Sequence, residues 1–305
     1  MRTFTLKGLF LTAVFMVLGC LAIHAADGDL ITKQITIKLE EAGTLPSKIG
    51  DTKKYKITNL KIMGEINGTD LRFIREMAGC DYKGMGTEGK LVTLDLSEAK
   101  IVEGGDIYFY SSYFYCYTSD DVIGGYAFYG CSSLTSLTLP SNVTKIGESA
   151  FEGCSSLTSL TLPSSVTEIG RSAFEGCSSL TSLTLPSSVT SIGSSAFYGC
   201  SGLTSIYVSW ESPLSIDAYT FKDANTEKCI LYVPNGTYDD YWISNWGIFE
   251  NIVEYDATGI NHIMTSGDAK EISRYAADGQ RLEVPAKGLN IVKYSDGCVK
   301  KVVVQ

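Results

Sequence analysis

The sequence predicts a short, mainly β solenoid in which strands from successive repeats stack in parallel. A period of 23 residues fills the middle of the chain, and residues 146–168 and 169–191 agree at 21 of 23 positions. Each unit alternates apolar and polar residues over a few positions, which is typical of a strand with one buried face. Each unit also has too few apolar residues to form a core alone, so it must stack on its neighbours.

The clear repeats begin at Ile123, and the fourth unit loses the pattern after Val208. In each unit, Leu-x-x-Leu-x-Leu forms the strand, and a proline ends it because proline has no N–H to donate. Phenylalanine and cysteine each recur at one inward position of the unit, at Phe128, Phe151, Phe174 and Phe197 and at Cys131, Cys154, Cys177 and Cys200. We expect reduced, buried thiols, because a disulfide would distort a regular stack; a disulfide is the alternative in an exported protein.

Weaker copies of the pattern extend the solenoid on both sides of the clear repeats. The seven predicted strands lie near 57–62, 91–96, 134–139, 157–162, 180–185, 203–208 and 229–233. Residues 26–102 are predicted to form an N-terminal cap with the first coils and one helix. That helix has Asp70 as its cap, an apolar stripe of Leu71, Ile74 and Met77, and Gly79 as its end.

The C-terminal part of the solenoid is predicted to span residues 123–256, including a cap over Tyr238–Ile252 with Trp242 and Trp246. The repeat motif Ile-Gly-x-x-Ala-Phe-x-Gly-Cys-x-x-Leu-x-x-Leu-x-Leu-Pro-x-x-Val, as in Ile146–Glu168, resembles the BspA-like leucine-rich-repeat surface proteins. This resemblance covers roughly residues 55–255. It implies a leucine-rich-repeat solenoid in a secreted or cell-surface bacterial protein, of a family whose characterised members are adhesins. It supplies no catalytic residues.

The first 25 residues are predicted to be an export signal, with Arg2 and Lys7 before an apolar run. We favour cleavage after Ala25. The alternative is a lipobox that makes Cys20 a lipidated N-terminus in the outer membrane. Both interpretations place the protein at the cell surface or outside the cell, and no membrane span is expected in the mature chain.

A small separate module is predicted at the C-terminus. Residues 257–269 are a polar linker, and residues 270–305 contain two hairpin signals, Asp278-Gly279 and Asp296-Gly297. This module resembles the C-terminal sorting domain of proteins secreted by Bacteroidetes-type bacteria, which implies export across the outer membrane. The alternative is a short tail that only packs or pairs strands.

Charge and composition argue against several functions. The chain has 25 basic and 34 acidic residues, for a net charge of −9, and lacks the basic stripe that nucleic-acid binding requires. His262 is the only histidine after the signal, and no Gly-x-Ser-x-Gly motif occurs. Residues 84–89 spell GxGxxG, but a helix precedes them and a strand follows, the reverse of a dinucleotide site. We therefore expect no enzyme, no cofactor and no metal site.

Two features are candidates for ligand binding. The first is the exposed strand face, where one column of the repeats carries Thr138, Thr161, Thr184 and Tyr207. The second is an insertion over 103–122, predicted to be a loop, in which seven of ten consecutive residues are aromatic. Those seven are Tyr108, Phe109, Tyr110, Tyr113, Phe114, Tyr115 and Tyr117. Tyrosine beside serine suits a recognition loop, although some of these rings can instead seal the first coils.

The preferred interpretation is an adhesin-like surface or secreted protein that binds a host or bacterial surface protein or a glycan. In this interpretation the strand face sets orientation and the aromatic insertion supplies anchors. The main alternative is a structural module of the cell envelope with no specific ligand, and a third is an exported hydrolase. An exposed aromatic crest favours binding, whereas a buried one favours a structural role.

Overall fold

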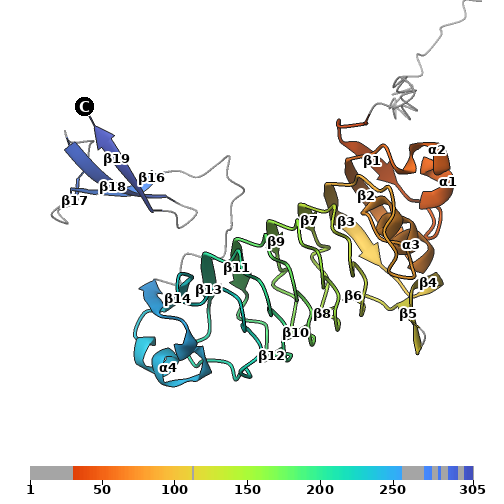
Figure 1. The fold of residues 1–305 in the computed structure, drawn as a ribbon. Helices are drawn as coiled ribbons and strands as arrows, with labels where there is room; N and C mark the ends of the chain where they lie inside the picture. The colour runs from red at the N-terminus through yellow and green to blue at the C-terminus, as the bar shows by residue number, and fades with distance from the viewer. Residues whose placement is uncertain are drawn as a thin grey trace, which may run out of the picture.

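The computed structural model describes residues 30–111 and 113–255, and the backbone of four later strands. The fold is a leucine-rich-repeat solenoid built mostly of parallel strands, with caps at both ends (Figure 1). This confirms the predicted fold class. The predicted signal segment 1–25, with Cys20, and the whole predicted linker 257–269 lie outside the described residues.

The main sheet is parallel and has nine strands. In spatial order they are β1 (Ile35–Lys38), β2 (Asn59–Ile66), β3 (Thr93–Ile101), β7 (Ser136–Thr138), β9 (Ser159–Thr161), β11 (Ser182–Leu185), β13 (Ser205–Val208), β14 (Ile230–Pro234) and β15 (Asn251–Tyr255). All seven predicted strands are present, most of them shorter or longer than expected. The sequence analysis missed β1 and β15, the two edge strands, which do not carry the full Leu-x-x-Leu-x-Leu pattern.

A second parallel sheet forms the other side of the central coils (Figure 1). It contains β6 (Val122–Ile123), β8 (Lys145–Ile146), β10 (Glu168–Ile169) and β12 (Ser191–Ile192). The glycine after each isoleucine is required by close packing between coils. At Gly147, for example, a Cβ would lie 2.5 Å from the backbone nitrogen of Gly125, so any larger residue would push the coils apart.

The core is ordered in columns that run along the solenoid. Adjacent rings of Phe128, Phe151, Phe174 and Phe197 stack nearly parallel at centroid distances of 5.1–5.3 Å. Phe221 continues this stack at 5.0 Å. Phe221 lies five residues after Ile216, as Phe151 lies five residues after Ile146 in the repeats. This spacing is the sequence signal for a further coil that was not used above.

The cysteine column consists of free thiols, as predicted. The thiols of Cys154, Cys177 and Cys200 each donate to the carbonyl oxygen of the phenylalanine one coil earlier, as Cys154 does to Phe128 at 3.1 Å. Burial raises the pKa of Cys131 and of Cys200 to about 12, so these thiols stay protonated at neutral pH. They therefore act as small hydrophobic residues under the turns.

Short helices form the N-terminal end: α1 (Leu45–Ile49), α2 (Asp51–Lys54) and α3 (Gly68–Met77). The cap of α3 is Asn67, so the prediction of Asp70 as the cap is wrong by one turn. Asp70 is instead the third helical residue and is buried, and its carboxylate accepts N–H groups from Asn67 and Leu45 at 3.0 and 2.9 Å. This capping box satisfies the first turn of α3 and attaches α1 to it.

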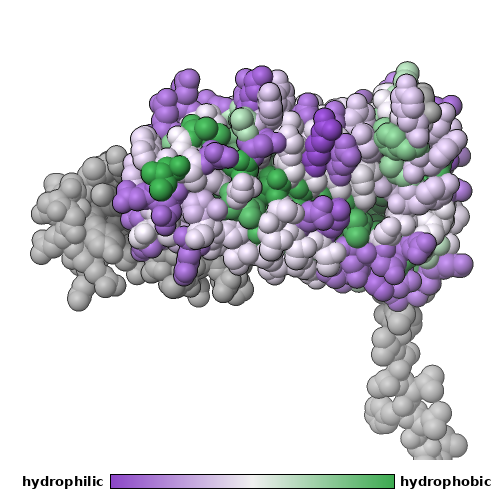
Figure 2. Space-filling view, turned by 90° about the horizontal axis from the view of Figure 1, so that it is seen from below, coloured by the Kyte–Doolittle hydropathy of each residue, from purple (hydrophilic) through white to green (hydrophobic). Residues whose placement is uncertain are grey.

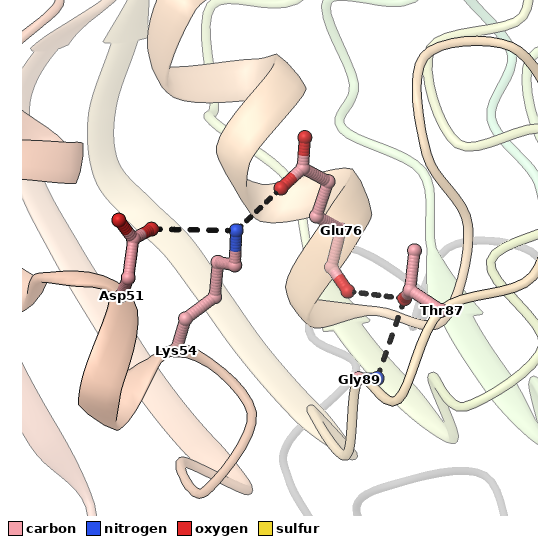
Figure 3. A network of polar contacts seen from close by, with 5 residues as sticks. All are labelled: Asp51, Lys54, Glu76, Thr87 and Gly89. Atoms are coloured by element: carbon pink, nitrogen blue, oxygen red, sulfur yellow. Dashed lines mark hydrogen bonds and ion pairs between the residues drawn. The ribbon is translucent and has the colours of Figure 1, made fainter.

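A polar network fixes the connection after α3 (Figure 3). Lys54 contacts Glu76 at 2.6 Å and Asp51 at 3.5 Å, and Thr87 donates to the Glu76 carbonyl oxygen at 2.6 Å. Burial alone would lower the pKa of Lys54, but the hydrogen bond and charge of Glu76 raise it. The GxGxxG segment is thus a structural connection between helix and strand, in the order that the sequence indicated.

The C-terminal cap consists of α4 (Tyr238–Ile243), the 3₁₀ helix η1 (Asn245–Ile248) and β15. Trp246 is fully buried, and its indole Nε1 donates to the carbonyl oxygen of Leu214 at 2.7 Å. Its ring lies 5.4 Å from that of Phe221, so it closes the phenylalanine stack. Trp242, predicted to share this role, is 52% exposed and lies on the outside of the cap.

The C-terminal module is an antiparallel sheet of four strands in the order β17-β16-β18-β19. The strands are β16 (Glu271–Ala276), β17 (Arg281–Leu282), β18 (Gly288–Tyr294) and β19 (Val299–Val304). The two predicted hairpins therefore form, with Asp278-Gly279 and Asp296-Gly297 between paired strands. Across the part of the chain that the structure describes, no helix is long and apolar enough to cross a bilayer.

Candidate functional site

The insertion between β3 and β6 is a β-hairpin, which corrects the prediction of a loop over 103–122. Strands β4 (Gly104–Ser111) and β5 (Phe114–Thr118) pair antiparallel, with Tyr110 opposite Tyr115. Alternating tyrosine and phenylalanine favour strands because their large side chains pack well on a pleated surface. The hairpin lies at the N-terminal end of the solenoid, where β4 packs against α3 (Figure 1).

Two of the seven predicted anchors belong to the core. Tyr108 is 1% exposed, and its hydroxyl donates to the Gly125 carbonyl oxygen at 2.9 Å. Burial raises the pKa of Tyr108 far above its ordinary value. Phe109 is also mostly buried, with its ring against those of Tyr126 and Tyr129. Neither ring therefore belongs to the exposed part of the insertion: Tyr108 is part of the core, and Phe109 is mostly buried but lines the groove described below.

The remaining aromatic residues of the hairpin reach solvent. Tyr113 is 93% exposed, Tyr115 is 61% exposed, and Phe114 and Tyr117 are also exposed. Tyr110 is half-buried, with its ring centroid 5.2 Å from that of Tyr115. The insertion therefore combines a buried seal over the first coils with an exposed aromatic crest.

An aromatic groove lies between the hairpin and the first regular coil. Its volume is about 440 Å³, and it is lined by Lys83, Gly84, Phe109, Tyr110, Ser111, Phe114, Tyr126 and Tyr129. Three of these were predicted site residues. Tyr126 and Tyr129 were not predicted as site residues, because the first repeat was treated as equivalent to the others. The sequence does distinguish them, since the next repeat has Ser149 and Glu152 at these two positions.

The groove wall is a packed cluster of rings. Phe109 and Tyr126 stack at 4.8 Å with an interplanar angle of 3°, and Phe114 and Tyr129 lie 5.1 and 5.6 Å from Tyr126. Tyr126 has a left-handed backbone with φ of 59°, and so do the serines at the same position of the next three coils. The turn therefore imposes this conformation, and the first coil uses it to present a tyrosine.

Arg75 of α3 lies on the buried side of the groove and connects the segments that line it. It is fully buried, and its guanidinium donates to the carbonyl oxygens of Tyr126, Ala127, Asp81 and Tyr129 at 2.6–3.1 Å. It also lies 5.1 Å from the ring centroid of Phe109. The buried guanidinium thereby joins the helix, the loop that carries Lys83 and the turn that carries both groove tyrosines.

The groove tyrosines are neutral hydrogen-bonding groups. Burial raises the pKa of Tyr126 and of Tyr129, and the carboxylates of nearby glutamates raise both further. Ring faces, hydroxyl groups and the Lys83 ammonium are therefore the chemistry that this site offers. Among the residues that the structure describes, no three histidine, cysteine, aspartate or glutamate side chains are grouped as metal ligands.

The predicted strand-face column lies on a different surface. Thr138, Thr161, Thr184 and Tyr207 belong to β7, β9, β11 and β13 of the main sheet, away from the hairpin (Figure 1). The two threonines in β7 and β9 are exposed, whereas Tyr207 stacks on Tyr232 at 4.4 Å. The two predicted binding features are thus not brought together into one site.

A second group of exposed apolar residues lies at the C-terminal cap. Apolar surface is visible near the α4 end of the molecule in Figure 2. The cap residues Trp242, Ile243 and Ile248 are exposed, and Ile243 is 81% exposed.

Comparison with known proteins agrees with the repeat assignment. Residues 121–245 match the family model described as BspA type leucine rich repeat region, in six copies. This region therefore consists of leucine-rich repeats of the BspA type. No curated protein matches the chain.

Solved structures of leucine-rich-repeat proteins are similar to parts of the chain. A leucine rich repeat protein from T. pallidum is 27% identical over 56% of this chain and 71% of its own, with a TM-score of 0.39. A leucine-rich repeat protein from Bacteroides ovatus is 20% identical over 73% of this chain and 42% of its own, with a TM-score of 0.37. The pneumococcal vaccine antigen PcpA is 17% identical over 66% of this chain and 69% of its own, with a TM-score of 0.38.

Proposed function

We propose that this protein is an exported, surface-associated binding protein whose ligand, a protein or a glycan, occupies the aromatic groove. The observation that carries this proposal is the exposed aromatic crest of the hairpin beside a groove lined by five aromatic rings. One of these five rings, that of Phe114, also belongs to the crest. Proteins with BspA-type repeats are typically surface proteins, which supports the location. The role is non-catalytic, and the ligand binds without being transformed.

The crest has the properties of a recognition surface. Tyrosine buries a large rigid area at a small cost in side-chain entropy, and its hydroxyl adapts to polar partners. Exposed rings are unfavourable in water unless a partner covers them, so a cluster of them at one place indicates binding. The regular coils offer mainly serine and threonine, which rarely dominate binding energy. We therefore assign ligand binding to the hairpin and the groove, and not to the threonine column of the main sheet.

A binding screen tests the proposal. The purified full chain would be presented to immobilised matrix proteins, mucins and glycans at physiological salt. We expect saturable binding that the double variant Tyr113→Ala/Tyr115→Ala weakens at least about tenfold, since truncating an anchor residue typically costs 1–2 kcal/mol or more. The matched control is Thr161→Ala. Binding that survives the double variant unchanged contradicts the assignment, and the absence of any ligand favours a structural role in the envelope.

For the C-terminal module we propose a role in sorting, because it folds as an antiparallel sheet of the predicted strands. Deletion of residues 270–305 should retain the protein inside the envelope of a secreting host, while groove-dependent binding by the extracted protein is unchanged. Normal secretion of the truncated chain would leave the module as a packing tail.

A further inference from the structure

We propose that the aromatic groove binds an extended, arginine-containing peptide segment whose guanidinium groups pair with Glu152 and Glu175. This inference rests on the proposed binding function of the groove and specifies the class of ligand. It assigns a role to a row of carboxylates that starts at the groove wall and forms no ion pair with the described residues.

The row follows from the register of the repeats. Tyr129, Glu152 and Glu175 occupy the same position in three consecutive coils. Backbone hydrogen bonds hold the turns in line, from Gly130 N–H to the Glu152 carbonyl oxygen and from Gly153 N–H to that of Glu175, both at 2.8 Å. Since adjacent coils are about 5 Å apart, as the phenylalanine rings show, the two carboxylates continue directly from Tyr129 along the solenoid.

These carboxylates have no cationic partner among the described residues. Lys145 pairs with Glu168 on β10 instead, at 2.8 Å. The guanidinium of Arg75 is occupied by carbonyl oxygens on the buried side of the groove. Arg171 occupies the position in its coil that Glu148 occupies in the preceding coil. It lies outside ion-pair distance of the glutamates that the structure describes.

The electrostatic environment of Glu152 favours a cation. Burial raises the pKa of Glu152, a hydrogen bond with Ser149 lowers it in part, and the neighbouring charges of Glu175 and Glu148 raise it again. The same glutamates lie close enough to the groove to raise the pKa values of Tyr126 and Tyr129 as well. A bound cation would offset this repulsion, whereas a neutral glycan would leave it in place.

Arginine fits both parts of the surface. A guanidinium stacks on aromatic faces and forms two parallel hydrogen bonds with a carboxylate, while an ammonium does only the second, as a point charge. An extended peptide advances about 3.3 Å per residue, so residues three positions apart span about two coils. One side chain in the groove and one guanidinium at Glu175 are therefore compatible with a single extended strand. Lys83 lies at the rim of the groove and disfavours a uniformly basic ligand.

The test uses two labelled peptides of twelve residues built on proline and serine, one with two arginines three positions apart and one with two glutamates at the same two positions. Fluorescence anisotropy with the full chain at physiological salt measures their affinities. We expect the arginine peptide to bind and the glutamate peptide not to bind. Glu152→Gln/Glu175→Gln should weaken binding about fivefold or more, in line with two partly exposed ion pairs. Phe114→Ala should also weaken it.

The matched control is Glu211→Gln/Asp239→Asn, which changes the net charge equally at positions remote from the groove. It should leave the affinity within about twofold, as expected when only screened, long-range charge is removed. Failure of the arginine peptide to bind, or equal weakening by both double variants, overturns the inference. Binding of a neutral glycan that needs Tyr113 and Tyr115 but not the glutamates would overturn it while the proposed function stands.

Discussion

The regular coils and the N-terminal end of this solenoid use the same core but expose different surfaces. In the coils from Ile146 to Val208 the core positions repeat with few changes, the phenylalanine rings stack at about 5 Å, and the exposed face carries mostly hydroxyl groups. At the N-terminal end the period is broken by a helix and a hairpin. There a buried arginine, neutral tyrosines and an aromatic groove replace the uniform columns.

This difference indicates how the two regions divide their roles. Nearly identical repeats supply a rigid support, because each coil packs against neighbours of almost the same sequence and shares one continuous core with them. A specific ligand needs unlike groups at one place, and uniform columns cannot provide them. The groove arises where Tyr126 and Tyr129 replace the serine and glutamate of the next coil and the hairpin packs beside them.

The largest expected effect tests the rigidity of the regular coils. Phe174→Ala removes a fully buried ring from the middle of the stack, and we expect a loss of about 3–5 kcal/mol in the free energy of unfolding. Urea denaturation followed by circular dichroism measures it. Phe114→Ala, which removes an exposed ring of the hairpin, is the control and should cost under about 1 kcal/mol. Equal losses would mean that the two regions do not differ in packing.

A second prediction separates the N-terminal end from the coils. Arg75→Ala leaves several buried carbonyl oxygens without a donor, and we expect a loss of about 2–3 kcal/mol confined to that end. Hydrogen exchange should become faster at residues 126–130 but remain slow at residues 174–177. Arg75→Met, which keeps more of the side-chain volume, should recover part of the stability but not ligand affinity. Faster exchange along the whole solenoid would contradict this division.

A third prediction concerns the thiol column of the coils. Burial raises the pKa of Cys200 to about 12 in the folded state, while an unfolded thiol titrates near 8.5. The folded chain therefore holds more protons between these values, and stability should fall as pH rises through about 9 to 12. Each such thiol contributes a slope of at most about 1.4 kcal/mol per pH unit. Urea denaturation at several pH values should give a shallower decline for Cys200→Ala than for the unmodified chain.

The smallest expected effect concerns the exposed strand face. Thr161→Ala removes an exposed hydroxyl of β9, and we expect a change within about 0.5 kcal/mol in stability. Groove-dependent ligand affinity should not change. A clear loss of affinity would show that the threonine column belongs to the binding surface and would remove the contrast between the two regions.

The sequence alone determined the solenoid and its registers. The 23-residue period, the alternation of leucines and the columns of phenylalanine and cysteine were sufficient, because each coil contacts almost only its neighbours. Local pattern was then a reliable guide to tertiary structure. It was less reliable at the ends, where Asn67 and not Asp70 is the cap of α3, and where Asp70 also accepts an N–H group from the distant residue Leu45.

Only the tertiary structure decided which aromatic residues are available to a ligand. The sequence placed seven rings in one insertion, but hairpin pairing buries Tyr108 and Phe109 and exposes Tyr113 and Tyr115. It also brings Tyr126, Tyr129 and Lys83 to the same groove from separate segments. Such a site depends on contacts between residues far apart in the chain, and these follow from packing against α3 and Arg75, which no local period encodes.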